Sequence, residues 1–418
     1  MRMIDLVTDC RAAGYSAPST CAGVNGARTI IERRRSFLGC FLRSSSLLLS
    51  VCVAVACSDG DASSQADVNP APVGNGTLAP LPSALPPYLA FYANNGFPLF
   101  DDLGIENKIY SGKLNSIDAS GDLCAKFKER GLVGHVAYQA FFSTTGTGGA
   151  EGVELGLDMP EALNTYFEDF KQLLQVIGEC GVPVVYALEA DPMSMAMNRA
   201  RSNWDFDPTK FPARIHDSGH PDALASGAPD SFAGFCQVLE YLRDTYAPNV
   251  MLAPTIKVWA SSGAARPDNE PADGWASDPG PKKDADFWLQ TGVHWDLLTT
   301  NWAPQERSSY DVYRSWARFF AAVASEMGVR IFIWKTDIAE EHFLDAPADW
   351  TNNLPQYYFD DAQYLADLGY VMVGLAYGGQ MKDEVPAPIA CWLKEYDSGQ
   401  SGNCDPHSGT LGKVMLPK

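Results

Sequence analysis

The sequence lacks the short motifs that mark several large classes of protein. It contains no CxxC pair and no HExxH, so a structural zinc site is not supported. No GxGxxG or P-loop follows any candidate strand, which disfavours an open doubly wound nucleotide-binding sheet. The acidic loop 261–283, which includes Trp275, shows no EF-hand spacing for calcium. We therefore expect no cofactor and no obligatory metal.

Positive charge is scarce as well. The chain has 31 Lys and Arg against 51 Asp and Glu, and 7 and 3 of these respectively lie in residues 1–56. Removal of that segment leaves 24 positive and 48 negative side chains, a net charge of about −24. Such a surface repels phosphate backbones, so we expect no nucleic-acid partner. A neutral ligand carries no such penalty.

A long apolar run is also missing, because the stretch 47–56 (LLLSVCVAVA) is too short to span a bilayer. It follows a basic group at 33–43 and ends in small residues before Cys57, which is the order of parts in a signal peptide. The tetrapeptide 54–57 (AVAC) resembles a lipobox, with Ala where Leu is commoner. The resemblance implies a signal segment over 1–56 and a lipid on Cys57. A flexible Pro, Ala and Ser-rich tether is predicted to follow over 57–87.

These features predict a membrane-anchored lipoprotein at the outer membrane or cell surface, facing the periplasm or the exterior. Ordinary secretory cleavage near Ala56 and a short buried helix are alternatives. Residues 34–38 (RRSFL) resemble a twin-arginine export signal, although a plain basic region fits equally well. We expect the lipid anchor to be the membrane contact and the chain to act as a monomer.

Cysteine usage fits an oxidising compartment. Five cysteines follow Cys57, namely Cys124, Cys180, Cys236, Cys391 and Cys404. Cys391 and Cys404 flank a polar loop and are predicted to form a disulfide. Cys124 and Cys180 lie near the ends of successive predicted helices, and neighbouring helices in a barrel could bring them together. Cys236 falls in an apolar helical pattern and is expected to be a buried thiol.

After the tether, runs rich in Val, Ile, Tyr and Phe alternate with period-3.6 apolar stripes, for instance at 163–177, 232–242 and 313–327. This pattern is typical of parallel strands joined by crossover helices. Strands are predicted at 88–93, 108–110, 133–142, 183–189, 250–259, 295–302, 330–336 and 370–377. Eight such units predict an α/β fold, a single (β/α)8 TIM-type barrel over 88–418.

Functional groups in such barrels lie at the C-terminal ends of the strands, and here those ends carry mainly carboxylates and aromatic rings. Aromatic faces stack on pyranose rings, while paired carboxyl groups handle the proton and the developing charge of a glycosidic bond. We therefore expect a carbohydrate partner. The candidate catalytic residues are Glu189 and Asp337, and the candidate substrate-binding residues are Asp191, Trp204, Trp259, Asn301, Trp302, Trp334, Tyr377 and Gln380.

This arrangement resembles the retaining glycoside hydrolases of clan A, and family 26 mannanase-like enzymes in particular. The segment 188–192 (LEADP) occupies the place of the clan's Asn-Glu-Pro-like motif, with Leu where Asn or His is expected. Asp337, or Glu340 further on, stands where the clan has Glu. The resemblance implies Glu189 as acid/base and Asp337 as nucleophile or base. The separation of the two carboxyl groups decides between retention and inversion.

Each candidate also has a structural interpretation. Glu189 could pair with Arg199 or Arg201, and Asp337 could cap a following helix. His135 lies in an apolar strand and fits a core histidine better than a ligand.

Trp302 and Trp334 could likewise be core residues. The long polar segment 193–229, with residues 204–207 (WDFD), is predicted to be a loop over the barrel mouth. A glycoside hydrolase is the leading hypothesis. A non-catalytic sugar-binding lipoprotein and a barrel that serves as a protein-interaction module are the alternatives.

Overall fold

The computed structural model describes one compact unit within residues 66–418. The described residues are 78–94, 109–114, 124–125, 127–128, 133–138, 140–261, 275, 278–302, 310–338, 358–377, 387–398 and 414–417. The predicted signal segment 1–56, Cys57, Glu340, Gln380 and Cys404 lie outside them. Within the described part, no helix combines the length and apolarity needed to cross a membrane.

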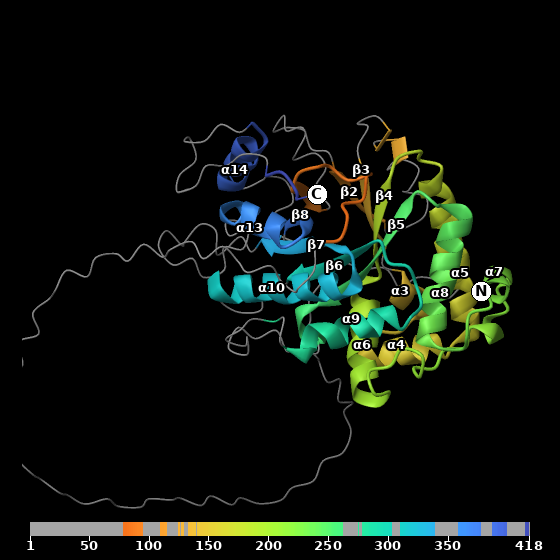
Figure 1. Cartoon of the computed structure of the whole chain (residues 1–418). Coiled ribbons are helices and arrows are strands. Elements are labelled where there is room, and N and C mark those ends of the chain that lie inside the picture. The colour runs from red at the N-terminus through yellow and green to blue at the C-terminus, as the bar shows by residue number, and fades with distance from the viewer. Residues whose placement is uncertain are drawn as a thin grey trace, which may run out of the picture. The chain divides into compact units, whose positions relative to one another are not determined.

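Eight parallel strands form the centre of the molecule (Figure 1). They are β1 (Ala90–Asn94), β2 (Ile109–Leu114), β3 (Val133–Tyr138), β4 (Val184–Leu188), β5 (Val250–Lys257), β6 (Leu297–Trp302), β7 (Arg330–Ile338) and β8 (Tyr370–Tyr377). Each strand from β2 to β8 pairs in parallel with the next, and β8 pairs with β1. The edge strands β1 and β2 also pack against each other. The predicted (β/α)8 barrel is therefore confirmed, including its weakest strand at 108–110.

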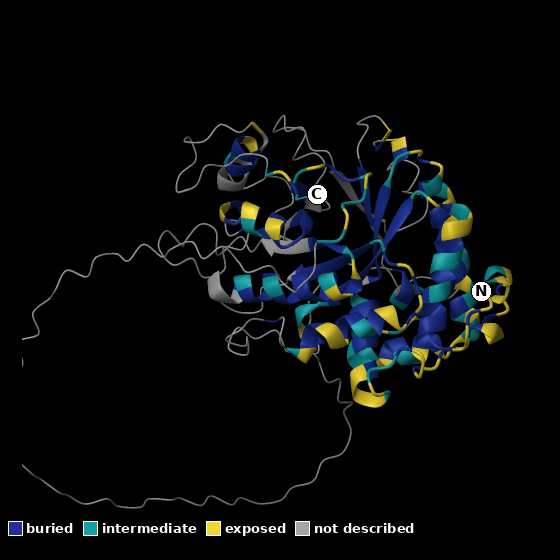
Figure 2. Cartoon of the chain, in the orientation of Figure 1, coloured by how far each residue is buried: buried dark blue, intermediate teal, exposed yellow. Residues whose placement is uncertain are grey.

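Helices surround the strands, with their buried faces turned inward and their exposed faces outward (Figure 2). The α-helices are α3 (Phe141–Thr145), α4 (Gly149–Leu157), α5 (Pro160–Gly178), α6 (Ala190–Asn203), α7 (Pro221–Ser226), α8 (Phe232–Tyr246), α9 (Pro279–Leu289), α10 (Tyr310–Met327), α13 (Ala362–Asp367) and α14 (Ala387–Ser398). Short 3-10 helices lie at η2 (His216–Ser218) and η3 (Val258–Ala260). The three predicted helical stripes fall within α5, α8 and α10.

The interior of the barrel is packed with side chains from facing strands. The His135 ring on β3 lies 5.0 Å from the Tyr92 ring of β1 and 5.7 Å from the Phe332 ring of β7. Gly374 on β8 makes room for Tyr92, because a Cβ there would lie 2.8 Å from the tyrosine ring. Burial lowers the pKa of His135 to about 3, so the ring is neutral near pH 7. The prediction of a core histidine is confirmed.

The predicted loop over the barrel mouth at 193–229 is wrong, since helices α6, η2 and α7 occupy much of it. On α6, Met193, Ala196, Met197 and Ala200 recur at helical spacing and are buried. Polar residues lie between them, so the composition of the segment predicts a loop although the apolar residues have helical spacing.

The base of the barrel ties the two ends of the described chain together. The Leu89 amide donates to Val414 O and the Leu416 amide donates to Pro87 O, each at 2.9 Å. The buried guanidinium of Arg330, the first residue of β7, donates to the carbonyl oxygens of Ala79 and Pro417. The packed body therefore includes the last part of the segment predicted as tether, which begins to pack by residue 79.

Cys124 and Cys180 form a disulfide with their Cα atoms 5.0 Å apart, which confirms the expectation that the barrel brings them together. Cys391 is also disulfide-bonded, while its predicted partner Cys404 lies outside the described residues. Cys236 is a buried free thiol, as predicted.

Candidate active site

Glu189 is the first residue after β4 and the N-cap of α6, and its side chain is fully buried. Its backbone adopts a left-handed conformation with φ 32° and ψ 63°. A non-glycine residue in this region costs on the order of 1–3 kcal/mol, and such residues cluster at functional sites. The strand-to-helix transition after β4 is therefore sharp, and it directs the carboxyl group into the protein.

Three donors converge on one oxygen of this carboxyl group. Glu189 Oε1 accepts hydrogen bonds from the backbone amides of Ala140 at 3.0 Å and Phe141 at 3.3 Å, and from the Tyr166 hydroxyl at 3.1 Å. The other oxygen, Oε2, is buried and has no hydrogen-bond partner among the described residues. We call Ala140 N, Phe141 N and the Tyr166 hydroxyl the Oε1 cradle.

Burial raises the pKa of Glu189 to about 8, because a charged carboxylate loses its hydration inside the protein. The three hydrogen bonds of the Oε1 cradle lower the pKa and the negative charge of Asp191 raises it, but desolvation outweighs the hydrogen bonds. The carboxyl group is therefore mainly protonated at neutral pH. Because Oε1 accepts all three hydrogen bonds, Oε2 is the oxygen that is left to carry the proton.

The alternative interpretation of Glu189, an ion pair with Arg199 or Arg201, is wrong. Arg199 pairs instead with Glu154 of α4 at 2.6 Å. Arg201 donates to the carbonyl oxygens of Ala260 and Ser261, the latter at 2.6 Å. Arg199 is half-buried and Arg201 is exposed, and each reaches an element next to α6, whereas Glu189 precedes that helix and is fully buried.

Asp191 stands two residues further on, in the first turn of α6, and forms an ion pair with Lys257 at the end of β5. Its side chain is 41% exposed. Ser194 braces this corner, since its hydroxyl donates to Thr255 O and accepts from the Lys257 amide, each at 3.1 Å. The ends of β4 and β5 are thus joined by polar contacts through the start of α6.

Asp337 lies inside β7, paired in register with Ala376 of β8. Ile338 continues the strand, so the helix-cap interpretation of Asp337 is wrong. In the order of the barrel, β5 and β6 separate β7 from β4. Glu189 and Asp337 therefore lie at or near the C-terminal ends of two strands that are three positions apart in the sheet.

The other candidate residues occupy different environments. Asn301 of β6 is buried, and its Oδ1 has no hydrogen-bond partner among the described residues. Trp334 of β7 is buried in the core, whereas Trp259 in η3 is 39% exposed. Trp204 ends α6 and stacks on Phe211 with the ring centres 4.1 Å apart. Trp302 and Tyr377 are the last residues of β6 and β8.

The residues of the Oε1 cradle are not recognisable in the sequence. Tyr166 reads as one more apolar position on the buried stripe of α5, and Ala140 and Phe141 read as the end of a strand. No local signal links them to Glu189, because Tyr166 is 23 and Ala140 is 49 residues away along the chain.

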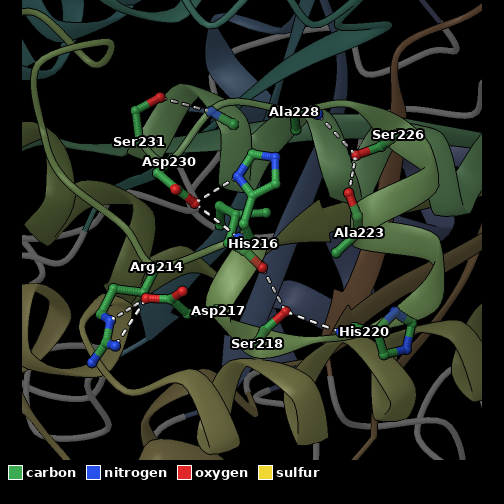
Figure 3. A network of polar contacts seen from close by, with 12 residues as sticks. Arg214, His216, Asp217, Ser218, His220, Ala223, Ser226, Ala228, Asp230 and Ser231 are labelled. Atoms are coloured by element: carbon green, nitrogen blue, oxygen red, sulfur yellow. Dashed lines mark hydrogen bonds and ion pairs between the residues drawn. The ribbon is translucent and has the colours of Figure 1, made fainter.

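A second polar cluster surrounds η2 and α7 (Figure 3). His216 contacts Asp230 at 3.0 Å, Arg214 pairs with Asp217 at 2.8 Å, and the Ser218 hydroxyl donates to a backbone carbonyl. These contacts stabilise the turns between short helices. Among the described residues, no three His, Cys, Asp or Glu side chains are placed to hold a metal ion.

No protein-family model and no curated protein matches the sequence. Solved structures do show matches. An endo-beta-1,4-mannanase double mutant from Cellulomonas fimi is 12% identical with a TM-score of 0.44, covering 77% of this chain and 76% of the mannanase. A GH53 catalytic domain from Ignisphaera aggregans is 11% identical with a TM-score of 0.41, covering 76% and 91%. A GH26 endo-beta-1,4-mannanase catalytic domain from Bacillus sp. JAMB-750 is 11% identical with a TM-score of 0.41, covering 72% and 80%. Because these identities are low, only the site itself can indicate the chemistry of this chain.

Proposed function

We propose that this chain is a glycoside hydrolase that acts on poly- or oligosaccharides outside the cytoplasm, with Glu189 as its general acid. The observation that carries the proposal is a buried carboxyl group at the C-terminal end of β4 whose pKa is raised to about 8. A general acid must hold its proton near neutral pH and release it to the leaving group. Oε2 bears that proton and has no partner among the described residues.

Asp337 is the proposed second carboxylate, on the strength of its position near the C-terminal end of β7. If its carboxyl group lies about 5 Å from that of Glu189, it acts as a nucleophile and the product keeps the anomeric configuration. A separation of roughly 6.5–9.5 Å admits a water, which Asp337 then activates as a base with inversion. NMR of the first-formed sugar distinguishes the two roles.

The test is hydrolysis of a panel of neutral polysaccharides by the purified domain, followed by reducing-end release. We expect activity on at least one glycan, and loss of that activity in Glu189→Gln and Asp337→Asn. Glu326→Gln, which alters an exposed carboxyl group on α10, is the matched control and should match the wild type. Hydrolysis that survives both substitutions would contradict the assignment.

The second candidate function is sugar binding without catalysis, and the complete burial of Glu189 favours it. A carboxyl group that stays covered serves only to fix the β3–α3 junction. In that case the domain binds a glycan with a measurable affinity, no bond is cleaved, and Glu189→Gln leaves the affinity unchanged.

The proposed location depends on lipidation of Cys57, since its thiol is the attachment point for acyl chains. Cys57→Ala should release the protein into the soluble fraction, and Cys236→Ala is a control that removes a buried thiol instead. Unchanged membrane association of Cys57→Ala would contradict a lipid anchor at this residue.

A further inference from the structure

Tyr166 is held rigidly in the layer between the barrel and its helices. It lies on the buried face of α5 and is fully buried. Its ring stacks on Phe235 of α8, with centres 5.5 Å apart, and meets the edge of Phe141 of α3, also at 5.5 Å. These contacts fix the ring plane and therefore the direction of the hydroxyl group, which ends 3.1 Å from Glu189 Oε1.

The two amides of the Oε1 cradle come from the start of α3. Ala140 is the N-cap of this helix, and its own side chain offers no acceptor to the first turn. The Glu189 carboxyl group replaces the missing cap by accepting from Ala140 N and Phe141 N. A pair of backbone amides cannot rotate away, so these donors remain aimed at Oε1 whatever the charge of the carboxyl group.

We infer that Tyr166 is a positioning residue, which together with the Ala140 and Phe141 amides confines the transferable proton to Glu189 Oε2 and stabilises the carboxylate left behind. In the transfer, the Oε2–H bond breaks and the proton bonds to the glycosidic oxygen. The electron pair of the breaking C–O bond goes to that oxygen, the anomeric carbon bonds to Asp337 or to the water that Asp337 activates, and the negative charge stays on the Glu189 carboxylate. Hydrogen bonds to a charged acceptor are stronger than those to a neutral one, so the Oε1 cradle favours the step.

Among the described residues, Asp191 in the first turn of α6 is a charged residue that raises the pKa of Glu189, and it is paired with Lys257 of β5. From α5, the Tyr166 hydroxyl is the group that donates a hydrogen bond to Glu189 among the described residues. Desolvation raises the pKa of Glu189, and the hydrogen bonds of the Oε1 cradle are the contributions that lower it.

The experiment compares Tyr166→Phe with Tyr370→Phe, a matched variant that removes a buried hydroxyl donating to Ala317 O at 3.1 Å, away from Glu189. The Glu189 carboxyl carbon is followed by NMR as a function of pH and assigned with Glu189→Gln. Tyr166→Phe should move the titration to higher pH by about one pH unit, because a hydrogen bond to the charged form is lost. Tyr370→Phe should leave it in place. An unchanged titration in a folded Tyr166→Phe protein overturns the inference.

A second measurement uses only the wild-type protein, in case Tyr166→Phe does not fold. Selectively labelled amide resonances of Ala140 and Phe141 should shift with the same midpoint as the Glu189 carboxyl carbon. Amide chemical shifts of Ala140 and Phe141 that do not change while the Glu189 carboxyl group titrates would also overturn the inference.

The catalytic consequence rests on the proposed function and has its own readout. Tyr166→Phe should lower the turnover of a glycan with a poor leaving group by about tenfold, and that of an activated aryl glycoside by less. If wild-type protein hydrolyses nothing while the titration moves as expected, the proposed function fails and the positioning role stands.

Discussion

Glu189 and Asp191 are two carboxyl groups separated by one residue, and the protein treats them in opposite ways. Glu189 is fully buried and accepts hydrogen bonds from three neutral donors, while the Asp191 side chain is 41% exposed and forms an ion pair with a lysine. Burial raises the pKa of Glu189 to about 8. The comparison teaches that hydrogen bonds from neutral groups do not replace the water that a carboxylate loses on burial.

The largest expected effect is on stability. In the folded protein the pKa of Glu189 is about 8, above its ordinary value of 4.5, so its stabilising contribution is fully present below pH 4.5 and is lost as the pH rises through about 8. The free energy of unfolding should therefore fall by about 5 kcal/mol over this interval, relative to Glu189→Gln. Urea unfolding of both proteins at several pH values measures the difference. If the free energies of unfolding of the two proteins change with pH in the same way, Glu189 has no raised pKa in the folded protein.

The next effect is on catalysis. Glu189→Gln preserves the shape of the side chain but removes the transferable proton. Hydrolysis of a glycan with a poor leaving group should fall at least about 10²-fold, the lower range for a general acid. An activated aryl glycoside should suffer less in the first step, and the ratio of the two losses is the informative measurement. Equal losses on both substrates would argue that Glu189 orders the β3–α3 junction instead.

Lys257→Met tests the ion pair between Asp191 and Lys257. Without its cation, Asp191 acts more strongly on Glu189, so the pKa of Glu189 should rise further and the basic limb of the pH–rate profile should move to higher pH. Lys282→Met, which breaks a pair with Asp286 on α9, is the control and should leave the profile unchanged. A shift to lower pH in Lys257→Met would contradict the proposed arrangement of charges.

The smallest expected effect belongs to Asp191→Asn. The ion pair with Lys257 is partly exposed, and such pairs contribute about 0–1 kcal/mol, so the free energy of unfolding should change little. The pKa of Glu189 should fall slightly, because Asp191 is one of the causes that raise it. Urea unfolding and the pH–rate profile measure the two effects, and a loss of several kcal/mol would mean that Asp191 is buried in solution.

The sequence by itself determined the barrel. The strand at Tyr370–Tyr377 coincides with its predicted range, and even the weak signal near residue 108 marks β2. Strands and crossover helices depend on periods of two and 3.6 residues, which are local properties of the chain. The same locality explains the error at 193–229, where small and polar residues hid the apolar stripe of α6.

Position in the barrel also pointed to Glu189 and Asp337, because strand ends can be counted along the chain. Only the tertiary structure decided what surrounds Glu189. Its three donors come from two elements earlier in the chain, α3 and α5, and two of them are backbone amides whose residue identity carries no signal. The titration of a carboxyl group depends on the water it loses and on the direction of each nearby donor, and both quantities exist only once the helices have packed against the strands.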